Sequence, residues 1–565
     1  MNNSDYLYDL FTEEAKAVLP EAHVPASGWS PNKLLGTDRN GNVVEKDNGG
    51  LSFDGVGGAG ESYIFGDGLN VDMNLVSVDT NDIATRIGFV TPQMYGAVGD
   101  NETDDSEAFQ QAVDSGCNVI IPPGNYKVAN ISITKSIYIR GIDNPLLTVP
   151  ENVYSSADSY PNVSSFILNG VSGVVVEGVR FNGSWLEIAE NNYASEGCSS
   201  YEYMANRNTN SFAVRILSES ENVTIKACKF DNFKDACVQI AELSKHITIE
   251  NNVFNENGWN GCSRCVGVMG VQTKNPTTNK TEPVVTYLTI RNNRILNCGS
   301  HGINLYAYNK HSNIIGNYIE NCGLVNEVLT DTIDGICIKL AGATEVRILE
   351  NICINGIGGA IAVYDETNLN PTYNITNVNV IIANNRIIGS DSEVSAGSGI
   401  ATRDVGPCLI VNNIVENVKL HAQNSDASAI YCRRGAIVSH NIVRDSYYGI
   451  RVTNGNGTGN GTIISNNRID ATSPIYAFNM DGAIITNNRL TADGATTVVR
   501  LGNINNCQIS GNVLFNATRG FTIANGIDNT QIYGNVYNGI TTTIYIPSNV
   551  TAGNYSVDFT PVTAS

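Results

Sequence analysis

Two aspartates, Asp365 and Asp404, occupy equivalent places in neighbouring repeats, directly after the strand-like segments GAIAVY and SGIATR. If these segments stack as adjacent strands, the two side chains lie about 5 Å apart. Carboxyl groups this close raise one another's pKa, so one can act as an acid while the other stays ionised. A separation of about 5–5.5 Å suits a retaining glycosidase and about 6.5–9.5 Å an inverting one, and Glu366 would supply the longer distance. Alternatively, both aspartates only form salt bridges with Arg403 and Arg434.

Aligning the strand-like segments on successive repeats predicts two columns of outward-facing side chains. The first column is Asn304, Cys337, Ala362, Ala401, Tyr431, Arg451 and Tyr476, and the second is Tyr306, Lys339, Tyr364, Arg403, Arg433, Thr453 and Phe478. Aromatic faces stack on sugar rings, and cations bind their acidic substituents. The predicted substrate-binding residues are therefore Tyr306, Lys339, Tyr364, Arg403, Tyr431, Arg433 and Arg451. The alternative is an ordinary sheet face, exposed to solvent or buried in an oligomer.

The element that positions these columns is a repeated segment of which Ile381–Ile387, IIANNRI, is one copy. Its last Asn recurs at 252, 293, 317, 351, 385, 413, 441, 467, 488, 512 and 535. Repeats with spacings of about 20–50 residues are typical of solenoids. Alternating apolar residues before each Asn predict a strand with one buried face. Because Asn tolerates left-handed backbone, we expect it at a corner, in a stacked ladder and without a catalytic role.

Composition narrows the functions of the chain. The net charge of −21 disfavours nucleic acid and anionic membranes as partners, since both attract basic proteins. No apolar run reaches the roughly 20 residues of a membrane span, and the first residues do not resemble a secretory signal. The 13 cysteines are expected to be reduced, with Cys298 and Cys322 stacked on neighbouring coils. The sequence contains no calcium-loop consensus, so neither a metal nor a cofactor is assigned.

Differences in residue pattern divide the chain into several segments. Residues 1–20 have the apolar spacing of a short helix, and residues 21–90 contain two short strands joined at Asn40-Gly41-Asn42. A capping helix is predicted at about 104–115, where Asp104 precedes Glu107 by three residues. The repeats occupy 91–548, and 549–565 is expected to be a short tail.

The segment YGAVGDNETDDSEAFQQAV, followed by IIPPGNYKV, resembles the opening of the pectate-lyase/polygalacturonase superfamily, in particular bacteriophage tailspike and tail-fibre depolymerases. The resemblance covers about 90–548. It implies an all-β, right-handed, single-stranded parallel β-helix of about twelve coils. It also implies a homotrimer in the virion tail, folded in the host cytoplasm, with a bacterial surface polysaccharide as ligand. The stretch LLGTDRNGNVVE is similar to virion-attachment or linker regions, which contact other tail or baseplate proteins.

The segment from Asp331 to Lys339 resembles the polygalacturonase motif Asp-Asp-Cys-Ile-Ala-Ile-Lys. The likeness places Asp334 on the second Asp, as a candidate acid, and Lys339 on the Lys. Ile333 replaces the first Asp, and His301, in Ser-His-Gly, lies upstream instead of downstream. The alternative is that Asp334 only forms a turn and that His301 is a satisfied surface or corner histidine.

These observations favour a tailspike that binds and hydrolyses a bacterial surface polysaccharide. One alternative is a receptor-binding fibre or adhesin without enzymatic activity. Another is a polysaccharide lyase, in which Lys339, Tyr364 or Arg403 would serve the elimination. A bacterial polysaccharide-degrading enzyme unrelated to a virion is a further alternative.

Overall fold

The computed structural model divides the chain into two compact units, residues 1–83 and 84–565. It describes residues 34–37, 43–46, 63–64, 69–72, 75–78, 88–150, 162–185, 210–259, 264–268, 284–305, 308–324, 335–364, 379–389, 397–403, 408–419, 427–433, 435–453, 459–494, 496–547 and 555–557.

The first unit contains two small antiparallel sheets. Strands β1 (Leu34–Thr37) and β2 (Val43–Lys46) pair in antiparallel fashion, which confirms the predicted pair of strands around Asn40-Gly41-Asn42. Strands β3 (Tyr63–Ile64), β4 (Leu69–Asp72) and β5 (Leu75–Val78) form the second sheet. The helix predicted over 1–20 lies outside the described residues.

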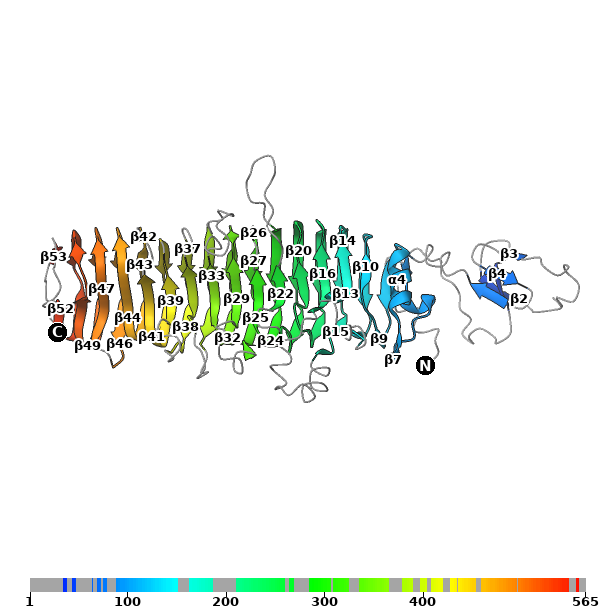
Figure 1. Cartoon of the computed structure of the whole chain (residues 1–565), viewed down its shortest axis with the longest axis horizontal. Helices are drawn as coiled ribbons and strands as arrows, with labels where there is room; N and C mark the ends of the chain where they lie inside the picture. Colours follow the sequence, from blue (N-terminus) through cyan, green and yellow to red (C-terminus); the bar gives the residue numbers. More distant parts are fainter. Residues whose placement is uncertain are drawn as a thin grey trace, which may run out of the picture. The chain divides into compact units, whose positions relative to one another are not determined.

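The second unit is a parallel β-helix, as predicted, in which each strand pairs with its equivalent on the next coil (Figure 1). Its strands stack in three faces, which we call the first, second and third in chain order within a coil, and the second and third faces belong to one hydrogen-bonded sheet. On the first face lie β14 (Ser172–Glu177), β17 (Glu221–Lys226), β20 (Ser244–Glu250), β23 (Val285–Arg291), β31 (Arg347–Leu349), β34 (Val380–Ala383) and β37 (Cys408–Val411). On the second face lie β15 (Arg180–Asn182), β18 (Lys229–Asp231), β21 (Val253–Asn255), β24 (Arg294–Cys298), β28 (Tyr318–Cys322), β32 (Ile352–Gly356), β35 (Arg386–Ile388) and β38 (Ile414–Glu416).

The third face carries the predicted columns. Its strands include β16 (Asn210–Leu217), β19 (Val238–Ile240), β22 (Arg264–Val268), β25 (His301–Leu305), β29 (Ile336–Ala341), β33 (Gly359–Tyr364), β36 (Ile400–Arg403) and β39 (Ser428–Cys432). Towards the C-terminus, long strands run continuously from the second face to the third: β41 (Ile442–Thr453), β44 (Arg468–Asp481) and β49 (Val513–Ile523).

A buried asparagine ladder fixes the corner between the first and second faces. The recurring Asn is buried at every coil from Asn252 to Asn535, and each Nδ2 donates to the Oδ1 of the next Asn at 2.9–3.0 Å. The predicted ladder is therefore confirmed. The left-handed conformation, however, belongs to the residue before it, such as Asn384 with φ 58°, while Asn385 points inward. The first Asn turns the chain and the second satisfies buried backbone groups, as when Asn385 donates to the Ile348 carbonyl at 3.0 Å.

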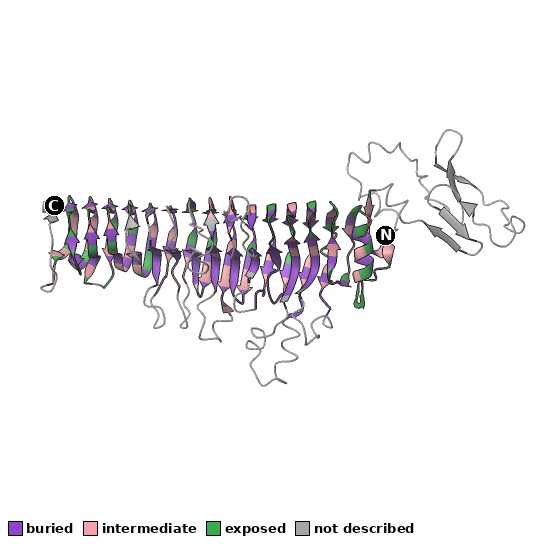
Figure 2. Cartoon of the chain, turned by 45° about the horizontal axis from the view of Figure 1, so that its top comes forward, coloured by how far each residue is buried: buried purple, intermediate pink, exposed green. Residues whose placement is uncertain are grey.

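Alternating side chains fill the interior of the coils, and Figure 2 shows the buried positions recurring along the stacked strands. On the second face the rings of Phe181, Phe230 and Phe254 stack with centroids 5.1 and 4.7 Å apart. The predicted neighbours Cys298 and Cys322 are in-register partners, and both are buried. Burial raises the pKa of Cys298, and hydrogen bonds with Cys298 and Cys337, together with burial, raise the pKa of Cys322, so both thiols stay protonated as small apolar groups.

Helix α4 (Ser106–Asp114) covers the N-terminal end of this unit with the buried side chains of Phe109 and Val113 among others. The predicted helix is confirmed, but Asp105, not Asp104, precedes its first turn. The Asp105 carboxylate instead accepts the backbone N–H groups of Val98 and Gly99 at 2.7 and 3.2 Å. At the other end, β53 (Tyr555–Val557) pairs with β51 (Thr530–Tyr533), so part of the predicted tail continues the first face. The described helices include none long and apolar enough to cross a membrane.

Candidate functional site

From Ala362 onward, the first predicted column lies in register on the third face. Ala362 pairs with Ala401, Ala401 with Tyr431, Tyr431 with Arg451, and Arg451 with Tyr476. The structure extends this column by one more cation, because Tyr476 pairs with Arg500 on β47 (Thr497–Asn505). The second column holds over part of its length, since Tyr364 pairs with Arg403 and Thr453 with Phe478.

The placement of Lys339 in the second column and of Cys337 in the first was wrong. Ile338, not Ile336, pairs with Ile303 and Ile361, so Lys339 lies in the first column between Asn304 and Ala362. Cys337 belongs to the buried core. The error is a shift by two residues. Ile336, Ile338 and Leu340 share one parity, so alternation alone cannot choose between them.

Arginines and tyrosines interleave along this part of the third face. The Arg451 guanidinium carbon lies 5.8 Å from the ring centroid of Tyr431, 5.4 Å from that of Tyr448 and 5.1 Å from that of Tyr476. Arg403 lies over Tyr364 and Tyr431 at 5.2 and 5.9 Å. Each such contact is worth roughly 0.5–2 kcal/mol, depending on how far the pair is desolvated.

Hydrogen bonds orient the ring of Tyr431 at the centre of this group. Arg433 Nε donates to the Tyr431 hydroxyl at 2.9 Å, and that hydroxyl lies 2.9 Å from Thr453 Oγ1. We call Tyr364, Arg403, Tyr431, Arg433, Tyr448, Arg451, Tyr476 and Arg500 the Tyr–Arg strip. The strip combines ring surfaces with cationic hydrogen-bond donors in a fixed array.

A small apolar floor lies beside the Tyr–Arg strip. Ile336, Ala362, Ala401 and Tyr431 form a separate buried cluster, against which the half-buried Tyr364 packs. Arg403 is exposed at the edge of this cluster. An apolar floor edged by polar groups is the usual composition of a ligand-binding surface.

None of the predicted catalytic residues lies in the part of the chain that the structure describes. Asp334, Asp365, Glu366 and Asp404 lie outside the described residues, as does the predicted binding residue Tyr306. The residues that precede the two aspartates, Tyr364 and Arg403, are in-register partners on adjacent strands. The proximity of Asp365 and Asp404 remains a prediction.

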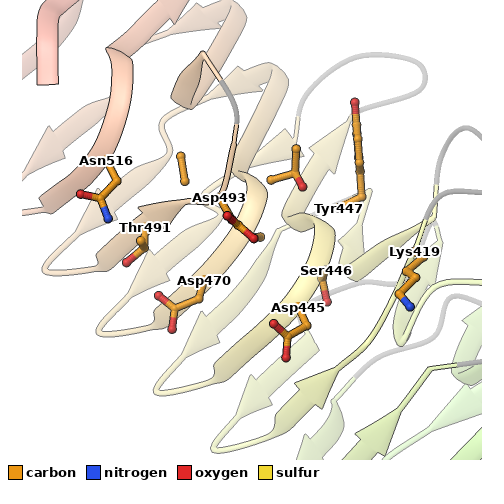
Figure 3. Close-up of a pocket in the computed structure, with 11 residues that line it drawn as sticks. Lys419, Asp445, Ser446, Tyr447, Asp470, Thr491, Asp493 and Asn516 are labelled. Atoms are coloured by element: carbon orange, nitrogen blue, oxygen red, sulfur yellow. The ribbon is translucent and has the colours of Figure 1, made fainter. Parts of the chain in front are cut away.

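A pocket that the sequence reasoning missed lies between the second and third faces (Figure 3). It encloses about 720 Å³. Three aspartates, Asp445, Asp470 and Asp493, line it, together with Lys419, Ser446, Tyr447, Ala471, Thr472, Thr491, Ala492 and Asn516. Figure 3 shows Asp445, Asp470 and Thr491 in a row across neighbouring strands. Carboxylates, hydroxyls and a ring around one concavity are groups that can bind and activate a sugar.

A one-residue irregularity hides this pocket in the sequence. Asp445 follows its corner residue Asn441 by four positions, whereas Asp470 follows Asn467 by three. Strand β41 has a register shift between Val443 and Ser446, and Asp445 there adopts φ 48°. The extra residue re-aims the strand, as bulges near active sites often do. Allowing one inserted residue in the repeat would have aligned the two aspartates.

Aromatic contacts join the pocket to the Tyr–Arg strip. Tyr447 lines the pocket, and its ring contacts that of Tyr448 edge-on at 4.8 Å. Tyr448 in turn contacts Tyr476 at 5.4 Å. Burial, with Tyr447 nearby, raises the pKa of Tyr448, so its hydroxyl remains a donor at neutral pH. The carboxylates and the strip therefore border one continuous surface.

His301 is buried, not at the surface as expected. It is 0 % exposed, and its Nδ1 accepts the backbone N–H groups of Ile336 at 3.1 Å and Gly335 at 3.4 Å. Its Nε2 lies 3.3 Å from Lys339 Nζ. The prediction that His301 forms satisfied hydrogen bonds is confirmed, but its second ring nitrogen contacts Lys339, a predicted binding residue. No group of three or more His, Cys, Asp or Glu suited to a metal ion occurs within the described ranges.

No protein-family profile matches the chain. The chain is 26 % identical over 220 residues to the pre-neck appendage protein of Bacillus phage B103, covering 29 % of this chain and 26 % of that protein. It is 23 % identical over 428 residues to the capsule K30/K69-specific depolymerase of Klebsiella phage K64-1, covering 65 % of this chain and 53 % of the depolymerase. The chain thus spans about half or less of the curated relatives it matches.

Among solved structures, the chain is similar to the pre-mature gene product 12 of bacteriophage phi29. The TM-score is 0.52 at 13 % identity, with 84 % of this chain and 67 % of that chain covered. These two relatives and this structure come from phages, which confirms the resemblance to phage proteins drawn from the opening motif.

Proposed function

We propose that the protein is a phage tailspike-type receptor-binding protein that binds and depolymerises an acidic bacterial surface polysaccharide. The observation that supports this most directly is the Tyr–Arg strip. Arg451 sits among three tyrosine rings on the third face of a chain whose net charge is −21. A local cationic and aromatic surface on an acidic body suits a chain of sugar rings bearing carboxylate or similar groups.

Hydrolysis is our preferred chemistry, with paired carboxylates as acid and base. Two sets of carboxylates are candidates. One comprises Asp365 and Asp404, with Glu366 and Asp334 as further members, and the other comprises Asp445 and Asp470 of the pocket. The likeness to the K30/K69-specific capsule depolymerase supports depolymerisation in general. Elimination by a lyase using Lys339 remains the alternative chemistry.

Incubation of the purified protein with a panel of capsular polysaccharides and lipopolysaccharides tests this proposal. Hydrolysis releases new reducing ends, whereas elimination produces unsaturated sugars that absorb in the ultraviolet. The variants Asp365→Asn and Asp404→Asn, compared with Asp445→Asn and Asp470→Asn, identify the catalytic pair. We expect one pair to lose at least about a hundredfold in turnover while binding is retained. Loss in neither pair would refute both assignments.

A binding-only protein is the second candidate. The chain is 28 % identical over 170 residues to the plasmin and fibronectin-binding protein A of Streptococcus pneumoniae, covering 28 % of this chain and 23 % of that protein. Tight binding without reducing ends, unsaturated sugars or loss of viscosity would establish this candidate.

We also propose that the protein is a homotrimer attached to the virion through residues 21–90 and folded in the host cytoplasm. The phage relatives support association with a virion. Gel filtration with light scattering tests the trimer, and a monomeric mass at micromolar concentration would refute it.

A further inference from the structure

A row of apolar side chains points outward from the first face over five successive coils. Its strands are β34, β37, β40 (Ala436–Ser439), β43 (Ile463–Ser465) and β45 (Ile484–Thr486). Each strand contributes one residue, and these in-register partners, which we call the apolar stripe, are Ile381, Leu409, Ile437, Ile463 and Ile484. Both chain neighbours of each residue are buried, while the residue itself stays partly exposed, up to 42 % for Ile437. At about 4.8 Å per coil, the stripe is roughly 19 Å long.

A column of shorter side chains lies directly beside the apolar stripe. Its members, two positions further along the same strands, are Ala383, Val411, Ser439, Ser465 and Thr486. Long side chains next to short ones form a ridge and a shallow groove that both run along the stack. The ridge of one molecule can therefore pack into the groove of another.

The ten outward side chains of this region carry no charge, in contrast to the same face nearer the N-terminus. There, Lys226 pairs with Glu177 at 3.0 Å, and Lys245 pairs with Glu221 at 3.0 Å. Single exposed apolar residues are ordinary on a protein surface, but a contiguous row of them marks an interaction surface. Depletion of charge is also typical of the centre of a protein–protein interface.

We propose that the apolar stripe is the contact between copies of this chain in the homotrimer, with the three stripes facing one another around the symmetry axis. When that axis runs parallel to the stack, each residue meets its own counterparts at the same height. Any charge on the contact would then face an identical charge and repel it. Ten uncharged side chains in a chain of net charge −21 meet this requirement.

A different protein would not need such a surface, because it could bring opposite charges to the contact. The requirement for an uncharged row therefore favours a second copy of the chain as the occupant. The inference rests on the proposed homotrimer and adds the face through which it forms. Since the Tyr–Arg strip lies on the third face, the contact between copies and the polysaccharide use different faces.

Ile437→Asp tests the contact, with Ile352→Asp as its matched control. Both residues are exposed isoleucines within strands, but Ile352 lies on β32 of the second face. In the trimer, the three carboxylates introduced by Ile437→Asp would face one another in an apolar interface. We expect this variant to raise the dissociation constant of the trimer by about a hundredfold or more, and Ile352→Asp to leave it within a few-fold. Light scattering during gel filtration over a dilution series measures both, and far-UV circular dichroism reports whether each variant keeps its β-structure.

Trimers of the unaltered protein and of Ile352→Asp, with monomers of Ile437→Asp, support the contact. Trimers that withstand Ile437→Asp, or that dissociate as readily with Ile352→Asp, overturn it. If Ile437→Asp does not fold, the milder double variant Ile437→Thr and Ile463→Thr replaces it, because Thr retains the preference for strands. An unchanged dissociation constant in the double variant overturns the contact. A monomeric unaltered protein overturns the proposed homotrimer and this contact together, whereas the polysaccharide panel tests binding and depolymerisation separately.

Discussion

Arg451 and Tyr476 are in-register partners on the adjacent strands β41 and β44, and the guanidinium carbon lies 5.1 Å from the ring centroid. The same cation lies over Tyr448 from its own strand and over Tyr431 from the strand before. One side chain thus connects three coils of the third face. Its rotamer is fixed by packing, so little conformational entropy is lost when a ligand binds.

Replacement of Arg451 by Met should weaken binding of an acidic polysaccharide by about 10- to 100-fold, because a charge-assisted hydrogen bond is lost. Biolayer interferometry at two salt concentrations measures the effect. Arg386→Met is the control, since Arg386 is exposed on the second face and contacts Glu416 at 3.5 Å. An equal loss of affinity in both variants would show a general effect of charge instead of a site.

Replacement of Asn385 by Ala should lower the free energy of unfolding by about 2–4 kcal/mol, because it leaves several buried partners unpaired. Asn385 donates to Asn413 Oδ1 at 2.9 Å and accepts from Asn351 at 3.0 Å. The exposed Asn384, at φ 58°, is the control. Asn384→Gly retains the left-handed corner and should cost less than about 1 kcal/mol. Denaturant unfolding compares the two variants. Equal losses of unfolding free energy would contradict the prediction that the buried ladder stabilises the fold more than the corner does.

Glu177 on the first face predicts a pH dependence of stability. Burial alone raises the pKa of Glu177, but the hydrogen bond from Tyr138 and the Lys226 ammonium at 3.0 Å outweigh burial, so the pKa lies below its usual 4.5. Because the pKa is lowered in the folded protein, the stabilisation is present above pH 4.5 and is lost as the pH falls through the folded value. Glu177→Gln should cost about 0.5–1 kcal/mol at neutral pH.

The difference in free energy of unfolding between Glu177→Gln and the unaltered protein should narrow below pH 4.5. Denaturant unfolding across that range measures it. Tyr138→Phe is the matched variant, because it removes the donor and should move the transition to higher pH. A difference that stays constant down to about pH 3 would contradict the assignment.

Buried thiols should resist alkylation in the folded protein. Burial raises the pKa of Cys228 and of Cys432 to about 12, so only about one thiol in ten thousand is ionised at pH 8. Iodoacetamide followed by peptide mass spectrometry should leave both unmodified until denaturant is added. Rapid labelling of either thiol in the folded protein would show that its coil opens.

The sequence predicts the scaffold more reliably than the site. The corner positions can be predicted from the sequence because Asn recurs at each coil and its amide has one geometrically suitable place, between stacked neighbours. The register of β29 cannot be predicted from the sequence. The alternating apolar residues Ile336, Ile338 and Leu340 fit equally well in two registers that differ by two residues. Neighbouring strands decide between these registers, and their effect appears only when the coils are stacked.

The site also contains features that no local pattern encodes. Asp445 and Asp470 line the same pocket because β41 contains a single extra residue. That residue places Asp445 one position further from its corner asparagine than Asp470 is from its own. Most residues of the Tyr–Arg strip were predicted because they continue the regular columns, where the repeat provides the alignment, but Tyr448 and Arg500 were not.

The asparagine ladder holds the coils together independently of the segments that connect one asparagine to the next. Each Asn side chain bonds to the coils directly before and after it, whether the next Asn follows after 21 residues, as from Asn467 to Asn488, or after 41, as from Asn252 to Asn293. Segments between successive asparagines can therefore lengthen, shorten or be exchanged between related genes at the corners without disturbing the stack. Under the proposed function, exchange of such segments would change the sugar-binding third face while the asparagine ladder stays the same.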